Sequence, residues 1–150
     1  MKVTKILAGY FKIASYYVSV KIKNMSKLKK KSTKKVREPT FARSPCPITA
    51  TLDLLGDKWT LIVIRDLFLG KRTYGDFQSS PEGIPTNILA ERLKRLLEHG
   101  IISKDAYQDK PVRYAYTLTK KGDALAPVVE EIAKWGLKFI KGTEAKLTKI

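Results

Sequence analysis

The sequence predicts an α+β fold that is mainly helical, with one two-stranded ribbon and a long helix after it. Three observations predict this fold. Apolar residues recur at helical spacing between residues 48 and 100, they alternate with polar residues near residue 115, and helical spacing then returns. With 150 residues and 43% hydrophobic content, the chain has room for one folded domain and a tail.

Charge is unevenly distributed along the chain. The net charge is +16, and residues 1–40 contain 12 of the 30 Lys and Arg residues but only 1 of the 14 acidic residues. We therefore predict a basic, disordered leader at 1–40 and a folded domain at 41–150, with 1–24 as an over-called start and Met25 as the true one. The lysine run of the leader is either a solubility tail or an arm that contacts phosphates without regard to sequence, and charge alone favours neither.

The apolar runs near the first residue do not predict a membrane segment. The longest uncharged stretch, Ile13 to Val20, has 8 residues, whereas a membrane span needs roughly 20. Lys12 interrupts the apolar region and no small-residue cleavage site follows, which disfavours a signal peptide. One cysteine, Cys46, and one histidine exclude an internal disulfide framework and a zinc ligand set. We expect a cytoplasmic protein with no membrane partner, no metal and no cofactor.

The first two predicted helices are short and lie on either side of a glycine. Ile48–Leu55 follows the Pro-Cys-Pro break at 45–47. Asp57 can cap a second helix, Lys58–Leu69, which has hardly any polar side and should be buried. Arg65 within it is expected to be a paired structural charge.

A turn separates the next two predicted helices. Thr73 can cap a short third helix that reaches Gln78, and the Ser-Ser-Pro-Glu-Gly stretch at 79–83 forms the turn. The fourth helix covers 85–99 and ends at Gly100. One of its faces carries leucines at helical spacing, and the other is polar.

Strand periodicity follows the fourth helix. Apolar and polar residues alternate in Val112–Thr119, which predicts a strand with one buried face. Ile101–Tyr107 is long enough to be its partner across a turn at 108–111. A last helix, from about Lys120 to Lys141, carries an apolar stripe, and Pro127 kinks it or marks a break near its start.

This order of elements is that of a winged helix-turn-helix, in which the second helix of the pair enters the major groove and the ribbon tip is the wing. We therefore expect DNA contacts from the start of the third helix, from the 85–99 recognition helix and from the 108–113 wing. Asn87 suits adenine, Lys94 suits phosphate or guanine, and the wing suits the DNA backbone or minor groove. The expected set is Arg72, Thr73, Thr86, Asn87, Ala90, Glu91, Lys94, Lys110 and Arg113.

Several short motifs occur in one collinear run over about residues 45 to 137. They include Cys46-Pro47, Gly56-Asp57-Lys58-Trp59, Leu89-x2-Arg92-Leu93-x2-Leu96 and Tyr116-x-Leu118-Thr119-x2-Gly122. This set resembles the HxlR-type transcription regulators of bacteria and archaea. Tyr74 stands where that family usually has Phe, and Pro85-Thr86 stands where Ser-Pro is common.

The resemblance implies a homodimeric repressor or activator that reads a pseudo-palindromic DNA operator and has no enzymatic activity. Dimers of the family form through terminal helices, which here correspond to Ile48–Leu55 and to the last helix. The stripe of the last helix is also more apolar surface than a small winged domain covers alone. The expected dimerisation residues are Leu125, Val128, Val129, Ile132, Trp135, Phe139 and Ile140.

Alternatives stay open for the function and for Cys46. The chain could be a winged-helix module that binds proteins, or a chromatin-type protein that binds any DNA through its basic leader. Polar groups on the fourth helix favour a sequence-specific regulator over the first of these. Cys46 either is a small apolar residue at the entry to the first helix or, as the resemblance implies, is a thiol that senses an electrophile or oxidant. The effector itself, the operator and the sign of regulation are not readable from the sequence.

Overall fold

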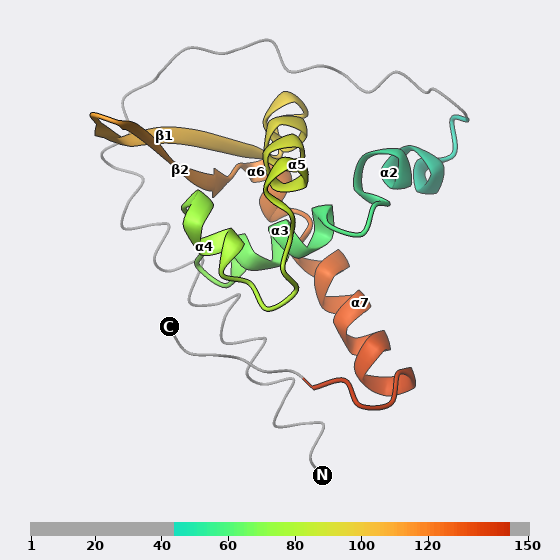
Figure 1. Cartoon of the computed structure of the whole chain (residues 1–150). Helices are drawn as coiled ribbons and strands as arrows, with labels where there is room; N and C mark the ends of the chain where they lie inside the picture. The colour runs from blue at the N-terminus through green and yellow to red at the C-terminus, as the bar shows by residue number, and fades with distance from the viewer. Residues whose placement is uncertain (1–43, 145–150) are drawn as a thin grey trace. The chain divides into compact units, whose positions relative to one another are not determined.

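The computed structural model describes residues 44–144, so the predicted leader at 1–40 lies outside the described residues. The chain divides into two compact units, one covering Lys34–Leu125 and one containing the segment from Ala126 onward. We describe each unit by itself. The first (Figure 1) contains α2 (Pro47–Leu55), α3 (Thr60–Phe68), α4 (Tyr74–Gln78), α5 (Thr86–Glu98), β1 (Ile102–Asp109), β2 (Val112–Leu118) and α6 (Lys120–Asp123).

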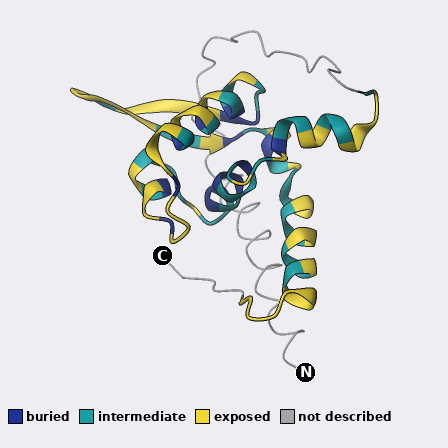
Figure 2. Cartoon of the chain, turned by 45° about the vertical axis from the view of Figure 1, so that its right-hand side comes forward, coloured by how far each residue is buried: buried dark blue, intermediate teal, exposed yellow. Residues whose placement is uncertain are grey.

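The core of the first unit lies where α3, α5 and the base of the ribbon meet. In Figure 2 the buried residues gather in these elements, whereas the ribbon is exposed over most of its length. The leucines of the predicted stripe at positions 89, 93 and 96 are at most 2% exposed, which confirms the inner face of α5. The buried apolar residues are Leu55, Val63, Ile64, Leu67, Phe77, Ile84, Leu89, Leu93, Leu96, Ile101, Ile102 and Leu118.

The second helix begins two residues later than predicted. Helix α3 starts at Thr60, not Lys58, and its N-cap residue is Trp59. The Asp57 carboxylate accepts hydrogen bonds from the backbone N–H groups of Trp59 at 2.8 Å and Thr60 at 3.0 Å. Those N–H groups have no partner within the helix, so the predicted capping role of Asp57 is confirmed even though the start differs.

Strands β1 and β2 form an antiparallel ribbon whose register pairs Ile102 with Leu118 and Ala106 with Tyr114. An irregularity between Ala106 and Gln108 precedes a tight turn at Lys110-Pro111. The prediction of one buried face along the whole second strand is wrong. Leu118 is buried, but Tyr114 and Val112 are exposed, because the ribbon extends beyond the core after its first residue pairs.

The single last helix predicted at 120–141 is wrong, whereas a break near Pro127 is confirmed. Helix α6 is short, and α7 covers Ala126–Phe139. Pro127 is the second residue of α7, where its missing N–H removes no helical hydrogen bond. Leu125, expected on the dimerisation stripe, lies in the connection, and its N–H donates to the Gly122 carbonyl at 3.0 Å.

Two glycines of the sequence motifs lie where a side chain has no room. A Cβ atom on Gly122 would collide with the backbone oxygen of Ile101, and one on Gly56 would collide with that of Leu52. Gly122 therefore allows α6 to approach the connection between α5 and β1 closely, and Gly56 allows the chain to leave α2.

Candidate nucleic-acid interface

Helix α4, the first helix of the candidate motif, has a well-defined start. The Thr73 hydroxyl accepts a hydrogen bond from the Asp76 N–H at 3.2 Å, and the Asp76 carboxylate accepts one from the Thr73 N–H at 2.8 Å. The N–H groups of Thr73 and Arg72 lower the pKa of Asp76, the first of them most strongly. In this reciprocal capping box, the hydroxyl of the predicted contact residue Thr73 is already hydrogen-bonded to the start of α4.

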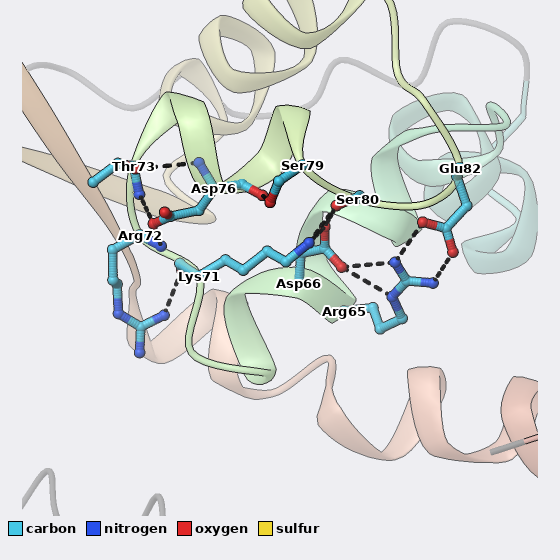
Figure 3. Close-up of polar contacts among 9 residues, drawn as sticks. All are labelled: Arg65, Asp66, Lys71, Arg72, Thr73, Asp76, Ser79, Ser80 and Glu82. Atoms are coloured by element: carbon cyan, nitrogen blue, oxygen red, sulfur yellow. Dashed lines mark hydrogen bonds and ion pairs between the residues drawn. The ribbon is translucent and has the colours of Figure 1, made fainter. Parts of the chain in front are cut away.

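The predicted contact residue Arg72 is half-buried, and its guanidinium already has partners. Nη1 donates to the carbonyl of Leu67 at 2.7 Å. It also donates to the carbonyl of Lys71 at 2.9 Å (Figure 3). These carbonyls belong to the end of α3 and the segment after it. Arg72 thus closes the C-terminal end of α3, and its role in DNA contact stays a prediction.

The turn between α4 and α5 is attached to α3 by a cluster of charged residues (Figure 3). Asp66 is only 2% exposed, and its carboxylate pairs with Arg65 at 2.7 Å and with Lys71 at 3.2 Å. Ser80 of the turn donates to the same carboxylate. Each buried charge therefore has an opposite partner, which buried ionised groups require.

Arg65 extends this cluster to the exposed side of the turn. Its guanidinium contacts both carboxylate oxygens of Glu82, at 2.5 and 3.0 Å. This bidentate contact raises the pKa of Arg65 above its usual range and lowers that of Glu82. The expectation that Arg65 is a paired structural charge is confirmed.

Helix α5 presents its predicted contact residues on the side opposite its buried leucines. Pro85 is the N-cap and Thr86 the first helical residue, so the helix begins one residue later than predicted. Five side chains of the predicted set are exposed along the helix: Thr86, Asn87, Ala90, Glu91 and Lys94. Glu91 pairs with Arg92 at 3.2 Å, and this contact leaves the amide of Asn87 and the amine of Lys94 as the groups best suited to base or phosphate contact.

Two arginines connect α5 to the preceding helices. Arg92 Nε lies 3.0 Å from the Asp57 carboxylate, and the Arg95 guanidinium donates to the backbone carbonyl of Asp53 in α2. Sequence reasoning did not assign these partners, because they lie 35 or more positions away in the chain. Helix α5 is thus fixed on its inner side by apolar packing and at its edges by charge.

The wing presents cations on an exposed ribbon. Lys110 lies in its turn, and Arg113 follows near the start of β2. Lys104, which the sequence analysis did not single out, lies with its amine 4.2 Å from the ring centre of Tyr114, a cation–π contact. Apolar and polar residues do not alternate regularly in β1, so the sequence pattern did not indicate the position of Lys104.

Comparisons with known proteins agree with this geometry. A family model described as HxlR-like helix-turn-helix matches residues 54–144, more than half of the chain. The chain belongs to the HxlR-like helix-turn-helix family. An uncharacterized HTH-type transcriptional regulator of Synechocystis is 38% identical over 96 residues, which cover 64% of this chain and 71% of that protein.

Two solved structures are similar to the fold of this chain. The redox regulator HypR in its oxidized form has a TM-score of 0.58 and 29% identity, covering 67% of this chain and 100% of that one. The reduced form of the transcriptional regulator YodB from Bacillus subtilis has a TM-score of 0.54 and 32% identity, covering 66% and 98%. The predicted fold class is confirmed.

The cysteine of this HxlR-like chain is exposed at the start of α2. Cys46 is the N-cap residue, and the backbone N–H of Thr49 lowers the pKa of its thiol, with smaller contributions from the Thr49 hydroxyl and the Ile48 N–H. A helix start favours a thiolate for this reason. The location anticipated from the sequence thus has the electrostatics that a reactive thiol needs.

Two helices carry exposed apolar side chains. In α2, Ile48 is 69% and Leu52 is 55% exposed, and they line a shallow groove together with Pro47 and Thr51. In α7, described by itself, the exposed residues Val128, Ile132, Trp135 and Phe139 lie at helical spacing. Val129 is half-buried, and Ile140 lies just after the helix and is exposed.

Residues 44–144 lack the features of a metal site and of a membrane span. That part of the chain contains no grouping of His, Cys, Asp and Glu suited to a metal ion. Nor does it contain a helix with the length and apolar content needed to cross a membrane.

Proposed function

We propose that this HxlR-like chain is a sequence-specific DNA-binding transcription regulator that acts as a homodimer on a pseudo-palindromic operator. The observation that carries the proposal is α5, whose leucines are buried while Asn87 and Lys94 on the opposite side are exposed. A polar helix face beside an exposed basic wing suits a major groove and its flanking phosphates. The relatives are named as transcriptional regulators, which supports the same function.

The homodimer is proposed from the exposed faces of α2 and α7. Helix α7 carries a continuous exposed apolar stripe of Val128, Ile132, Trp135 and Phe139. Single exposed apolar residues are common on protein surfaces, whereas a contiguous patch marks an interaction site. A second copy of the same stripe would cover it under twofold symmetry. Two recognition helices related in this way would enter major grooves roughly 34 Å apart.

The test of DNA recognition is selection of bound sequences from a random duplex pool, using the full chain and a chain that lacks residues 1–40. A selected site with a dyad, recovered by both proteins, is the expected result. Binding of every sequence alike, lost on deletion of the leader, would instead support the chromatin-type alternative. Failure to bind any duplex would favour a protein-interaction module.

The homodimer is tested separately by sedimentation of the full chain at micromolar concentration. Ile132→Glu places a charge in the apolar stripe of α7, so we expect it to convert the dimer to a monomer. Lys138→Glu changes charge on the same helix outside that stripe, so it should leave the dimer intact. A wild-type monomer at this concentration would contradict the proposal.

A second candidate function is a thiol switch at Cys46. Its exposure and lowered thiol pKa favour the thiolate, the form that attacks oxidants and electrophiles. With one cysteine in the chain, oxidation by diamide would join two protomers or attach a small thiol. DNA affinity of wild type and Cys46→Ser, before and after diamide, tests this. Loss of binding in the wild type alone supports the switch, and equal behaviour leaves Cys46 as a structural residue.

A further inference from the structure

A side-chain hydrogen bond joins the first residues of the two helices of the helix-turn-helix. The hydroxyl of Tyr74, at the start of α4, donates to the backbone carbonyl of Thr86, at the start of α5, over 2.6 Å. A carbonyl oxygen has two acceptor positions, so this bond is compatible with the helical hydrogen bond of the same group. Phenylalanine at position 74 would preserve the ring and remove only this donor.

Helix α4 presents the Tyr74 hydroxyl from a fixed position. The capping box of Thr73 and Asp76 defines its start. On its inner side Phe77 is 1% exposed and lies edge-on to Tyr116 of the ribbon, with ring centres 6.1 Å apart. Because α4 is held at both its start and its inner face, the Tyr74 hydroxyl can hold a neighbouring segment in place.

The first turn of α5 lacks such attachments of its own. Its N-cap, Pro85, provides no side-chain hydrogen bond to the helix start. Thr86 and Asn87 are exposed, and the nearest buried residues are Ile84 before them and Leu89 after them. Leu89, Arg92 and Leu93 fix the helix from its fourth residue onward, so Thr86 and Asn87 are the part of the first turn whose position depends on few contacts.

We propose that Tyr74 is a positioning residue for base recognition, whose hydroxyl fixes the first turn of α5 so that Thr86 and Asn87 meet base edges in a single register. This inference rests on the proposed function of α5 in DNA recognition. Bidentate contact with a base requires the side chain within about 0.5 Å of its productive position. A first turn released from Tyr74 samples several positions, whereas Lys94, two turns later, keeps its place.

Three proteins test this inference as full chains: wild type, Tyr74→Phe, and the control Ser79→Ala, which removes an exposed hydroxyl that donates to the Asp76 carbonyl within α4 and lies outside the predicted contact residues. Each is used to select sequences from a random duplex pool, and each is titrated with the wild-type site. Urea unfolding is measured in parallel, because both groups of the lost hydrogen bond can be hydrated in the variant.

We expect Tyr74→Phe to unfold at the wild-type urea midpoint and to bind the wild-type site roughly three- to tenfold more weakly. Its selected sequences should lose preference at the position that Asn87→Ala also relaxes and keep it elsewhere, while Ser79→Ala keeps the whole preference. An unchanged preference with Tyr74→Phe, equal weakening at every position, or a lower unfolding midpoint would overturn the inference. A wild-type chain that selects no sequence would overturn the proposed function as well.

Discussion

Arg92 of α5 and Asp57 before α3 form an ion pair, with 3.0 Å between Nε and Oδ1. The same carboxylate accepts hydrogen bonds from the backbone N–H groups of Trp59 and Thr60. One side chain thus caps α3 and fixes the inner edge of α5. Asp57 and Arg92 belong to two separate motifs of the sequence, and their contact gives a physical reason for the presence of both.

Asp57→Ala is expected to destabilise the fold by about 1 to 2 kcal/mol, the usual loss for a helix cap. The two N–H groups lose their acceptor, and Arg92, whose side chain is 14% exposed, loses one of its two acidic partners. The free energy of unfolding in urea measures this. Asp105→Ala, which removes an exposed carboxylate from the ribbon, should change it little, and equal effects of the two would contradict the capping role.

Asp66→Ala should lower the free energy of unfolding further, by on the order of 3 kcal/mol. The substitution removes the buried carboxylate that pairs with Arg65 and Lys71. Asp66 is 2% exposed, whereas Glu82 at the outer end of the same cluster is 31% exposed. Glu82→Ala should therefore cost at most about 1 kcal/mol. Urea unfolding of the two variants compares them, and a larger loss for Glu82→Ala would refute this account of the cluster.

Stability should fall in acid, in part through Asp76. Its pKa is lowered chiefly by the Thr73 N–H, so the unfolded chain binds the proton more readily than the folded one. The contribution is fully present above the unfolded pKa, about 4, and is lost as the pH falls through the lower folded value. Asp76→Asn should thus be less stable than wild type at pH 7, with a difference that shrinks below pH ~4. A difference independent of pH would exclude this origin.

Gly122→Ala should destabilise the fold by about 1 to 3 kcal/mol, because the new methyl group meets backbone that cannot move aside readily. Gly136 in α7 is a matched control, since no heavy atom lies within 4 Å of the position its Cβ would take. There the same substitution should stabilise the helix by roughly 0.5 to 1 kcal/mol. Thermal unfolding of both variants gives the comparison, and changes of the same sign would contradict it.

Within the DNA-facing set, Asn87 and Lys110 should affect binding differently. Asn87→Ala should relax base preference at one position and weaken the preferred site by about 1 to 3 kcal/mol. Lys110→Ala should weaken all sequences alike and reduce the salt dependence of binding by about one unit of slope. Titrations at several salt concentrations with preferred and scrambled duplexes separate the two. An unchanged sequence preference in Asn87→Ala would show that the first turn of α5 does not read bases.

The inner face of α5 could be predicted from the sequence, because three leucines at helical spacing lie on one side of a helix and that side is buried wherever the core is. The ribbon shows where periodicity is insufficient. Val112 and Tyr114 alternate as buried residues do, yet their burial depends on how far the core extends, which is a property of the whole fold. The pairing of Arg65 with Glu82 depended in the same way on a turn 17 residues away.

Of the candidate site, residue types were more predictable than their partners. Asn87 and Lys94 were expected on the outer face and are exposed there. Arg72 was expected at the start of the third helix as a DNA contact, but its guanidinium donates to the carbonyls of Leu67 and Lys71. The role of the Tyr74 hydroxyl could not be predicted from the sequence, because its acceptor is a backbone carbonyl and no side-chain pattern reveals such a partner.

The ribbon leaves the core after the pair of Ile102 and Leu118, so the evolution of its outer part is less constrained by packing. Residues near the turn at Lys110-Pro111 contribute little to burial, so substitutions, insertions and deletions there escape the penalty that follows any change in a packed interior. Descendants of one ancestral gene can therefore explore new wing tips while folding as well as their parent.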